Sequence, residues 1–310
     1  MFIDIHGHLS PPGEKGGGPP SLRDPEAVID HKRALGIGLT VIGSPVGAGV
    51  MLPLPDIDNY RQSADAVRAH NELMAGLVDQ YPDSLRTYAY LDPFGDERML
   101  SQARDLVGDW RFVGLVVNSS INGEYLSSPR AEQFFAMADE MAVPVLMHPP
   151  ARPVGADSLG EFGMVEHIGR FNDVTAGLAA ILRGGVLDRY PNLALVAAAG
   201  GGAIAQLAEK LDLAAAPRDG GEPSSRPSEA LRRIHVDTSC PSAHNIAANI
   251  AVLGADHVLF GTDAPPLMAA LEPIVGLVSG AGLTPAELER VACRNATELY
   301  GLEPTFAPAP

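Results

Sequence analysis

Lysine and cysteine are scarce in this chain, and acidic side chains far outnumber basic ones. Its 310 residues include 22 Lys and Arg against 38 Asp and Glu, which gives a formal net charge of −16. Phosphate backbones and anionic lipids are bound by clustered Lys and Arg, so this charge balance argues against both. We therefore expect no nucleic-acid partner and no membrane surface, and a small molecule is the more natural ligand.

The two cysteines, Cys240 and Cys293, are too few for a disulfide framework or a thiolate zinc site, and we expect both to stay reduced. Long apolar runs are also missing, because none reaches the roughly 20 residues that cross a bilayer. The opening residues Met1–Asp4 lack the basic start and apolar stretch of a signal peptide. These absences predict a cytoplasmic protein.

Short apolar runs alternate with longer helical patterns along the whole chain, which is typical of repeated βα units. Most runs are nearly continuous in Val, Ile, Leu and Ala, as expected for parallel strands covered on both faces. The predicted strands are Phe2–His6, Ile37–Gly43, Arg86–Leu91, Phe112–Asn118, Val143–His148, Leu193–Ala199, Ile234–Thr238 and His257–Thr262. Eight parallel strands favour a closed (β/α)8 barrel, also called a TIM barrel. We predict one barrel domain over residues 1–303 and a disordered tail over 304–310.

Helices are predicted between the strands, where apolar residues recur at three- and four-residue spacing. They include Asp58–Gln80, Arg130–Met141, Phe171–Gly184, Ala203–Leu213 and Pro285–Tyr300. Thr284, followed by Pro285 and Glu287, makes a good start for the last of them. The Gly- and Pro-rich segment Ser10–Pro20 and the polar segment Ala216–Pro227 are expected to be surface loops, the first of them at the catalytic end of the barrel.

The positions of four side chains indicate a metal site. His6 and His8 lie two residues apart at the end of the first strand, so both imidazoles point to the same side and can reach one ion. Gly7 between them leaves room for close approach. His148 ends the fifth strand and Asp263 follows the eighth. Because barrel strands end at one mouth, we predict that these three histidines and Asp263 hold one divalent ion, which also satisfies a carboxylate that is costly to bury alone.

The other histidines carry less information. His31 and His70 fall within helical segments and are expected at the surface. His257 begins the eighth strand at the far end of the barrel, and His235 lies inside the seventh, where a hydrogen-bonded core histidine is the simpler interpretation. His167 and His244 are in or near loops on the catalytic side, where either could contact substrate.

Seven segments of the chain contain distinctive motifs: Ile3–His8, Gly114–Val116, Asn122–Leu126, Pro144–Pro149, Gly185–Leu193, Val258–Asp263 and Asn295–Thr297. Together they span almost the whole chain and resemble the amidohydrolase superfamily, specifically the group that includes aminocarboxymuconate-semialdehyde decarboxylase. The resemblance implies a (β/α)8 barrel and one divalent ion, with zinc expected first and manganese as the alternative. It further implies cleavage of carboxylate or neighbouring carbon bonds of unsaturated or aromatic acids, and a homodimer.

One position departs from the family pattern. Family members usually carry a histidine before the triple glycine that follows strand six, whereas this chain has Ala199 before Gly200–Gly202. A methyl group cannot move protons. Either Asp263 handles the proton alone, or another residue such as His167 takes that role, or the usual reaction has been lost.

The end of strand four bears on the number of ions. Binuclear members of the superfamily commonly use a carboxylated lysine there to bridge two ions, but here that strand ends at Asn118, which favours a single ion.

Positive charge at the mouth is a further requirement for an acidic substrate. A guanidinium matches a carboxylate in a bidentate fork, so Arg152 and Arg170 are candidates for substrate binding. Asn118 and His167 are further candidates for substrate contact.

These residues permit three functions. The leading hypothesis is nonoxidative decarboxylation of a small unsaturated or aromatic carboxylic acid, with the ion as Lewis acid and Asp263 as the proton shuttle. The alternative is metal-assisted hydrolysis of a lactone, amide or carbon–carbon bond, with Asp263 as base. The third is a catalytically silent binding protein, which the loss of the strand-six histidine would explain and the intact ligand set opposes.

Overall fold

A computed structural model of the protein describes residues 1–12, 20–44, 62–215, 226–265 and 271–302. Residues 13–19, 58–61, 216–225 and 304–310, for which the sequence analysis made predictions, lie outside these described ranges. Within the described residues, no helix combines the length and the apolar character needed to cross a bilayer.

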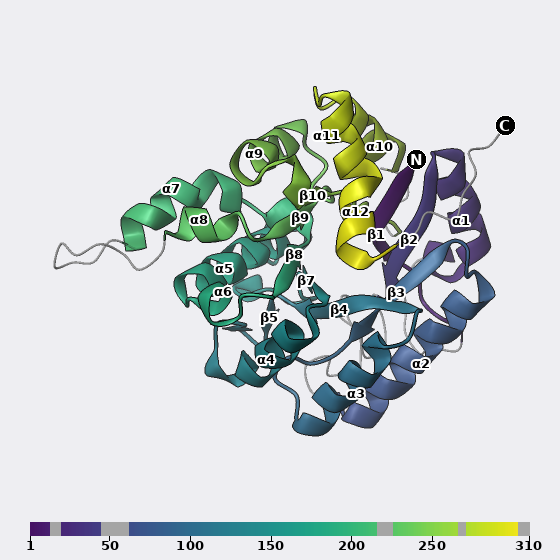
Figure 1. The fold of residues 1–310 in the computed structure, drawn as a ribbon, viewed down its shortest axis with the longest axis horizontal. Coiled ribbons are helices and arrows are strands. Elements are labelled where there is room, and N and C mark those ends of the chain that lie inside the picture. Colours follow the sequence, from purple (N-terminus) through teal and green to yellow (C-terminus); the bar gives the residue numbers. More distant parts are fainter. Residues whose placement is uncertain (13–19, 45–61, 216–225, 266–270, 303–310) are drawn as a thin grey trace.

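Eight parallel strands form the centre of the structure (Figure 1). They are β1 Phe2–His8, β2 Ile37–Gly43, β3 Leu85–Tyr90, β4 Phe112–Asn118, β7 Pro144–His148, β8 Ala194–Ala197, β9 His235–Asp237 and β10 Val258–Leu259. Each pairs in parallel with the next in chain order. A bridge between Gly7 and Ala264 and a hydrogen bond of 3.0 Å from Ile5 N to Phe260 O join the first strand to the last. The predicted (β/α)8 barrel is confirmed.

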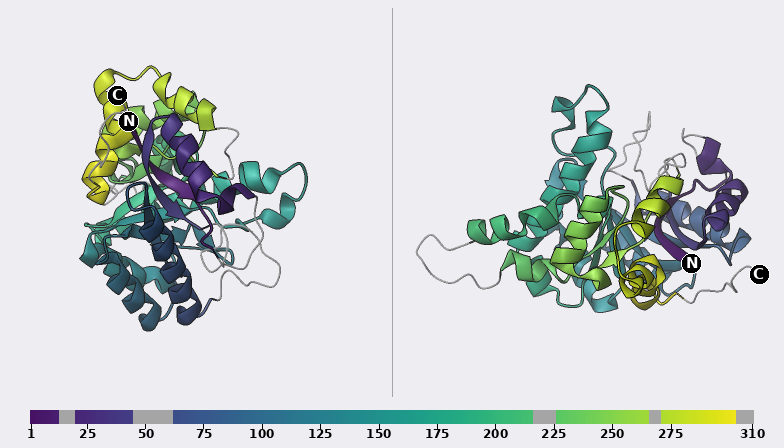
Figure 2. Two further views of the ribbon diagram at one scale, coloured as in Figure 1. Left: turned by 90° about the vertical axis from the view of Figure 1, so that its right-hand side faces the viewer. Right: turned by 90° about the horizontal axis from the view of Figure 1, so that it is seen from above.

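Helices pack around the outside of this barrel (Figures 1 and 2). The α-helices are α1 Pro25–Ala34, α2 Ala64–Gln80, α3 Glu97–Val107, α4 Glu132–Met141, α5 Arg170–Arg183, α6 Val186–Arg189, α7 Ile204–Ala215, α8 Pro227–Leu231, α9 Ala243–Leu253, α10 Leu271–Ser279, α11 Pro285–Glu289 and α12 Asn295–Tyr300. Shorter helical turns lie at Pro20–Arg23, Pro129–Ala131, Ala156–Ser158, Val165–Gly169, Ala199–Gly201, Ala255–His257 and Arg290–Arg294. A short antiparallel pair, β5 Ser120–Ile121 and β6 Glu124–Tyr125, follows β4.

Local sequence explains where the last helical stretch begins. Thr284 Oγ1 accepts a hydrogen bond from Glu287 N at 3.3 Å, while the Glu287 carboxylate accepts one from Thr284 N at 2.8 Å. This capping box satisfies two backbone donors that the helix itself leaves free. The predicted helix Pro285–Tyr300 is present as α11, the π-helical turn Arg290–Arg294 and α12 in succession.

The structure places His70 in the interior, which corrects the expectation of a surface residue. His70 is buried on α2, and its ring centroid lies 6.1 Å from that of Tyr90. Val67 and Met74 are buried on the same helix, three residues before and four after it. His70 therefore belongs to the apolar face of α2, because such spacing puts side chains on one side of a helix. His31 is half-exposed and pairs with Glu272 at 2.9 Å.

His235 also differs from its prediction as a hydrogen-bonded core histidine. Its Nδ1 is buried without a hydrogen-bond partner in the described part of the chain, and its ring packs against that of His257, tilted by 32° with centroids 4.7 Å apart. His257 lies in the turn before β10, not within a strand. Burial, and then the charge of His257, lower the pKa of His235 to about 4. The folded protein thus keeps this imidazole neutral down to acid pH.

We predict that His235 makes the fold acid-sensitive. An unfolded histidine has a pKa of about 6.5, so as the pH falls from there towards 4 the unfolded chain binds a proton that the folded chain rejects. The stabilising contribution is complete above pH 6.5 and is lost across that window, amounting to about 3 kcal/mol at roughly 1.4 kcal/mol per pKa unit. Urea unfolding of wild type and His235→Gln from pH 7 to 4 should show a smaller loss in the variant. Equal losses, or the same change in His31→Gln, would contradict this prediction.

Candidate metal centre

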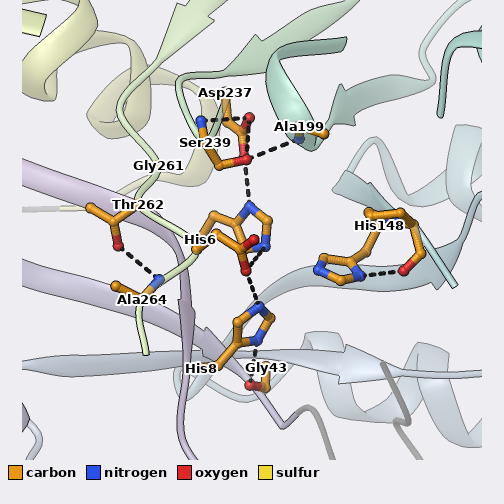
Figure 3. Close-up of polar contacts among 12 residues, drawn as sticks. His6, His8, Gly43, His148, Ala199, Asp237, Ser239, Gly261, Thr262 and Ala264 are labelled. Atoms are coloured by element: carbon orange, nitrogen blue, oxygen red, sulfur yellow. Dashed lines mark hydrogen bonds and ion pairs between the residues drawn. The ribbon is translucent and has the colours of Figure 1, made fainter. Parts of the chain in front are cut away.

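The four side chains predicted to hold a metal ion converge at the mouth of the barrel. His6 and His8 come from β1, His148 from the end of β7, and Asp263 from the turn after β10. One potential ligand atom from each lies within 4.8 Å of the others. In Figure 3 the three imidazoles point towards a common centre. Within the described residues, no second group of three or more His, Cys, Asp or Glu has such a geometry.

The donor atoms of this cluster suit a cation. His8 Nε2 lies 2.8 Å and His6 Nε2 lies 3.6 Å from Asp263 Oδ1. The ring centroids of the three histidines are 4.9 to 5.3 Å apart. His6 Nε2 and His148 Nε2 are buried and have no hydrogen-bond partner in the described structure. Buried polar atoms are costly when left unsatisfied, and a divalent ion would satisfy both of these nitrogens.

The other nitrogen of each imidazole is held by an oxygen. His6 Nδ1 lies 2.6 Å from Asp237 Oδ2, His8 Nδ1 lies 3.1 Å from Gly43 O, and His148 Nδ1 lies 2.8 Å from Pro149 O. With Nδ1 donating its proton to these acceptors, each Nε2 presents its lone pair to the centre. Such outer partners fix the tautomer and the ring orientation of metal-binding histidines.

Asp237 is a residue of this site that the sequence analysis did not single out. It is fully buried at the end of β9, and its second oxygen, Oδ1, accepts from Gly200 N at 2.8 Å, Ser239 N at 3.1 Å and Ser239 Oγ at 2.9 Å. Four hydrogen bonds, counting the one from His6, thus hold the carboxylate in place. Figure 3 shows Asp237 between His6 and Ser239. Its place at the end of a predicted strand was the available signal, although its role depends on a partner 231 residues away.

Electrostatics favours the protonation states that a metal requires. Burial lowers the pKa of His148 well below its usual value and also lowers that of His8. Burial alone would raise the pKa of Asp263, but the neighbouring His6 and His8 hold it below its usual range. Burial acts to lower the pKa of His6, yet the hydrogen bond to Asp237 and the nearby carboxylates raise it overall. At His6 alone, the pKa thus moves towards the protonated form and away from the form that a metal binds.

Gly7 lies in a crowded part of β1. A Cβ at this position would lie 2.4 Å from Thr40 Cγ2 and 2.9 Å from Lys32 Nζ. The missing side chain therefore makes room for these two neighbours behind the strand.

The structure separates the four predicted substrate contacts into two pairs. Asn118 ends β4 directly beside His148 in the sheet register, and its Nδ2 is buried without a partner among the described residues. Arg170 opens α5, its side chain is 10% exposed, and its charge helps to lower the pKa of His148. Both therefore lie near the cluster. His167 is exposed on the turn Val165–Gly169, in the segment between β7 and α5 that stands out from the barrel (Figure 2).

Arg152 lies in the same protruding segment between β7 and α5, and its side chain is 66% exposed. Its guanidinium pairs with Asp157 at 2.5 Å. Both residues line a surface cavity of about 300 Å³ together with Asn122 and Val154.

Ala199 occupies the turn Ala199–Gly201 after β8 with a φ of 53°, a conformation uncommon for a residue other than glycine. Its N–H donates to Ser239 Oγ at 2.9 Å, and the next residue, Gly200, donates to Asp237. The turn is thus tied to the carboxylate that holds His6 (Figure 3). The chain keeps this turn against the cluster but offers no titratable side chain at its first position.

Comparison with known proteins agrees with this geometry. The model of an amidohydrolase family, Amidohydro_2, matches residues 3–302, and the chain belongs to that family. The predicted resemblance is thereby confirmed.

Individual relatives within this family are distant in sequence. A 2-amino-3-carboxymuconate-6-semialdehyde decarboxylase of Dictyostelium discoideum is 22% identical over 252 residues, which are 79% of this chain and 68% of that protein. The crystal structure of 5-carboxyvanillate decarboxylase from Sphingomonas paucimobilis superposes with a TM-score of 0.82 at 19% identity, covering 98% of this chain and 99% of the other. A dihydroxybenzoic acid decarboxylase from a Polaromonas species, with bound manganese and 2-nitroresorcinol, has a TM-score of 0.79 at 16% identity, covering 97% and 96%. These relatives are decarboxylases of aromatic or unsaturated acids.

We predict that replacing His148 by Ala abolishes metal retention, because the change removes one of four donors and leaves a void on one side of the ion. Protein purified without added metal should carry about one ion per chain in the wild type and less than a tenth of that in His148→Ala. Inductively coupled plasma mass spectrometry measures this directly. His257→Ala, at the opposite end of the barrel, is the matched control and should retain the metal. Full metal content in His148→Ala would show that His148, at the end of β7, is not a metal ligand.

Proposed function

We propose that this chain is a metal-dependent nonoxidative decarboxylase of a small aromatic or unsaturated carboxylic acid. The observation that supports it is the convergence of three imidazoles and one carboxylate within 4.8 Å at the barrel mouth. Membership of a family with decarboxylase relatives gives this donor set a chemical context. Asp263 and the side chains around it are assigned roles on that basis.

His6, His8, His148 and Asp263 would hold one divalent ion. Three neutral nitrogens and a carboxylate suit zinc, our first expectation, and also manganese, which the Polaromonas neighbour contains. When bound, the ion would supply Lewis-acid polarisation of a substrate oxygen. A single ion is favoured because β4 ends at Asn118, where no lysine is present to bridge a second.

Arg170 and Asn118 are proposed to orient the substrate. Arg170 is largely buried and near enough to His148 to influence its pKa, so its guanidinium can attract a carboxylate at the mouth. Glu166, which pairs with Arg170 at 3.0 Å, is 60% exposed, and water screens that ion pair. The buried Nδ2 of Asn118 has no partner in the described residues and can donate to a substrate oxygen. The two side chains would thus fix the acid against the cluster.

Asp263 is proposed to deliver the proton that replaces carbon dioxide. Loss of carbon dioxide leaves an electron pair on carbon, and one proton must fill that position. The Ala199 methyl group cannot supply it, and the exposed His167 has no described contact with the cluster. Asp263 Oδ1 lies 2.8 Å from His8 Nε2 and 3.6 Å from His6 Nε2, which keep the carboxylate ionised in the free protein. Asp263 must therefore first take up a proton, from water or from an acidic group of the substrate, before it can transfer that proton to the carbon. This uptake requires that the contacts with His6 and His8 weaken.

The reaction class can be tested with zinc- and manganese-loaded protein and a panel of hydroxylated benzoic acids. We expect stoichiometric release of carbon dioxide, detected by mass spectrometry, with no oxygen-18 from labelled water in the aromatic product. Products that carry solvent oxygen-18 would instead indicate hydrolysis. Retained metal without turnover across the panel would indicate a silent binding protein.

The two arginine candidates can be separated by matched substitutions. We predict that Arg170→Met lowers kcat/KM about 10- to 100-fold, because a charge-assisted hydrogen bond to a carboxylate contributes roughly 1.5–3 kcal/mol. Arg152→Met should change it less than threefold, since that side chain is exposed and paired with Asp157. Steady-state kinetics, with thermal melts to confirm folding, measures both. The reverse order of effects would move the substrate site to the Arg152 cavity.

A further inference from the structure

A buried ammonium group lies behind the candidate metal centre. Lys32, on α1, is 3% exposed, and its Nζ donates to Asp4 Oδ2 at 2.7 Å and to Ala264 O at 2.9 Å. Lysine is rarely buried unless it is paired, because removing its charge from water is costly. This side chain therefore has a specific partner on β1 and another on the turn that follows β10.

Asp4 extends this contact into a network that holds the same turn. Its Oδ1 accepts from His6 N and from Thr262 N, both at 3.0 Å, and its Oδ2 accepts from Thr262 Oγ1 at 2.7 Å as well as from Lys32. Asp4 is fully buried, so water does not compete for these contacts. The pair thus links α1, the strand that carries two of the proposed ligands, and the residue before Asp263.

Asp263 needs such support because its backbone is unusual. Its φ is 55°, in the left-handed region that residues other than glycine seldom adopt. The residues on either side of it are both held in place. Thr262 donates to Asp4 through its N–H and its hydroxyl. The Ala264 carbonyl accepts from Lys32 Nζ, and the Ala264 N–H donates to Thr262 Oγ1 at 3.2 Å. The Asp263 N–H itself donates to His6 O at 2.7 Å. The surrounding contacts hold the residue in this conformation.

We propose that Lys32 is a positioning residue for Asp263. Its ammonium, neutralised by Asp4, holds the Ala264 carbonyl and so keeps the Asp263 carboxylate facing His6 and His8. Lys32 does not bind the ion, because its Nζ is engaged on the far side of β1, next to Gly7. The inference depends on the metal centre and is independent of the reaction performed there.

The test measures metal affinity without turnover. Lys32→Met alone strands the Asp4 carboxylate in the interior and is expected to fold poorly. The double variant Lys32→Met with Asp4→Asn removes both charges together, and the new amide still offers one oxygen as an acceptor. Buried pairs often tolerate such an exchange. Asn295→Ala is the control, since Asn295 is buried at the other end of the barrel and donates to Ala255 O and Val258 O, each at 2.7 Å.

Metal-stripped full-length proteins are titrated with Co²⁺, whose visible absorption reports the ligand set, and with Mn²⁺ for the dissociation constant. We expect the double variant to bind either ion 10- to 100-fold more weakly, the size typical of losing a partner that orients a ligand. Its Co²⁺ spectrum should shift towards that of Asp263→Asn, while Asn295→Ala keeps the wild-type spectrum and affinity.

A double variant that binds both ions within twofold of wild type would overturn the assignment. So would one that does not fold, since the pair would then serve the fold and not the turn. Neither result bears on whether the loaded enzyme releases carbon dioxide, so failure here is distinct from failure of the proposed function.

Discussion

The contacts that close the barrel between β1 and the chain after β10 are the constraint on which the site depends. Asp263 N donates to His6 O at 2.7 Å, and His8 N contacts Ala264 O at 3.4 Å. These bonds bring a carboxylate against imidazoles from which it is separated by more than 250 residues. Without closure, the ends of the first and last strands would lie on opposite edges of a sheet. The metal chemistry proposed for this chain is in this sense a product of barrel topology.

Much of this arrangement could be predicted from the sequence, because strand ends are a property of the chain. The ranges of β2 and β4 match the predictions to the residue, and the four proposed ligands meet as expected. Asp237 and Lys32 could not be assigned, since both act through contacts with segments distant in the sequence and neither changes the local hydrophobic pattern. His70 was misjudged for a related reason: a histidine can occupy the apolar face of a helix when a neighbour such as Tyr90 accommodates its ring.

Burial separates the four predicted substrate contacts into enclosed residues beside the cluster and exposed residues at the surface. Asn118 and Arg170 are largely enclosed, whereas Arg152 and His167 are in contact with solvent. Ala199 adds a further distinction, because its turn donates one hydrogen bond to Ser239 and one to Asp237 although its first side chain is a methyl group. The turn is thus held against the cluster without a titratable group, and the proposed function assigns the proton to Asp263 instead.

The crowding at Gly7 has a consequence for how this protein can change. Any side chain there would have to displace Thr40 and the Lys32 ammonium, so the middle of His6-Gly7-His8 tolerates substitution poorly. Random mutagenesis aimed at new metal specificity should leave this codon fixed and vary the mouth instead. Loss of this one glycine would disturb both imidazoles and the buried lysine together.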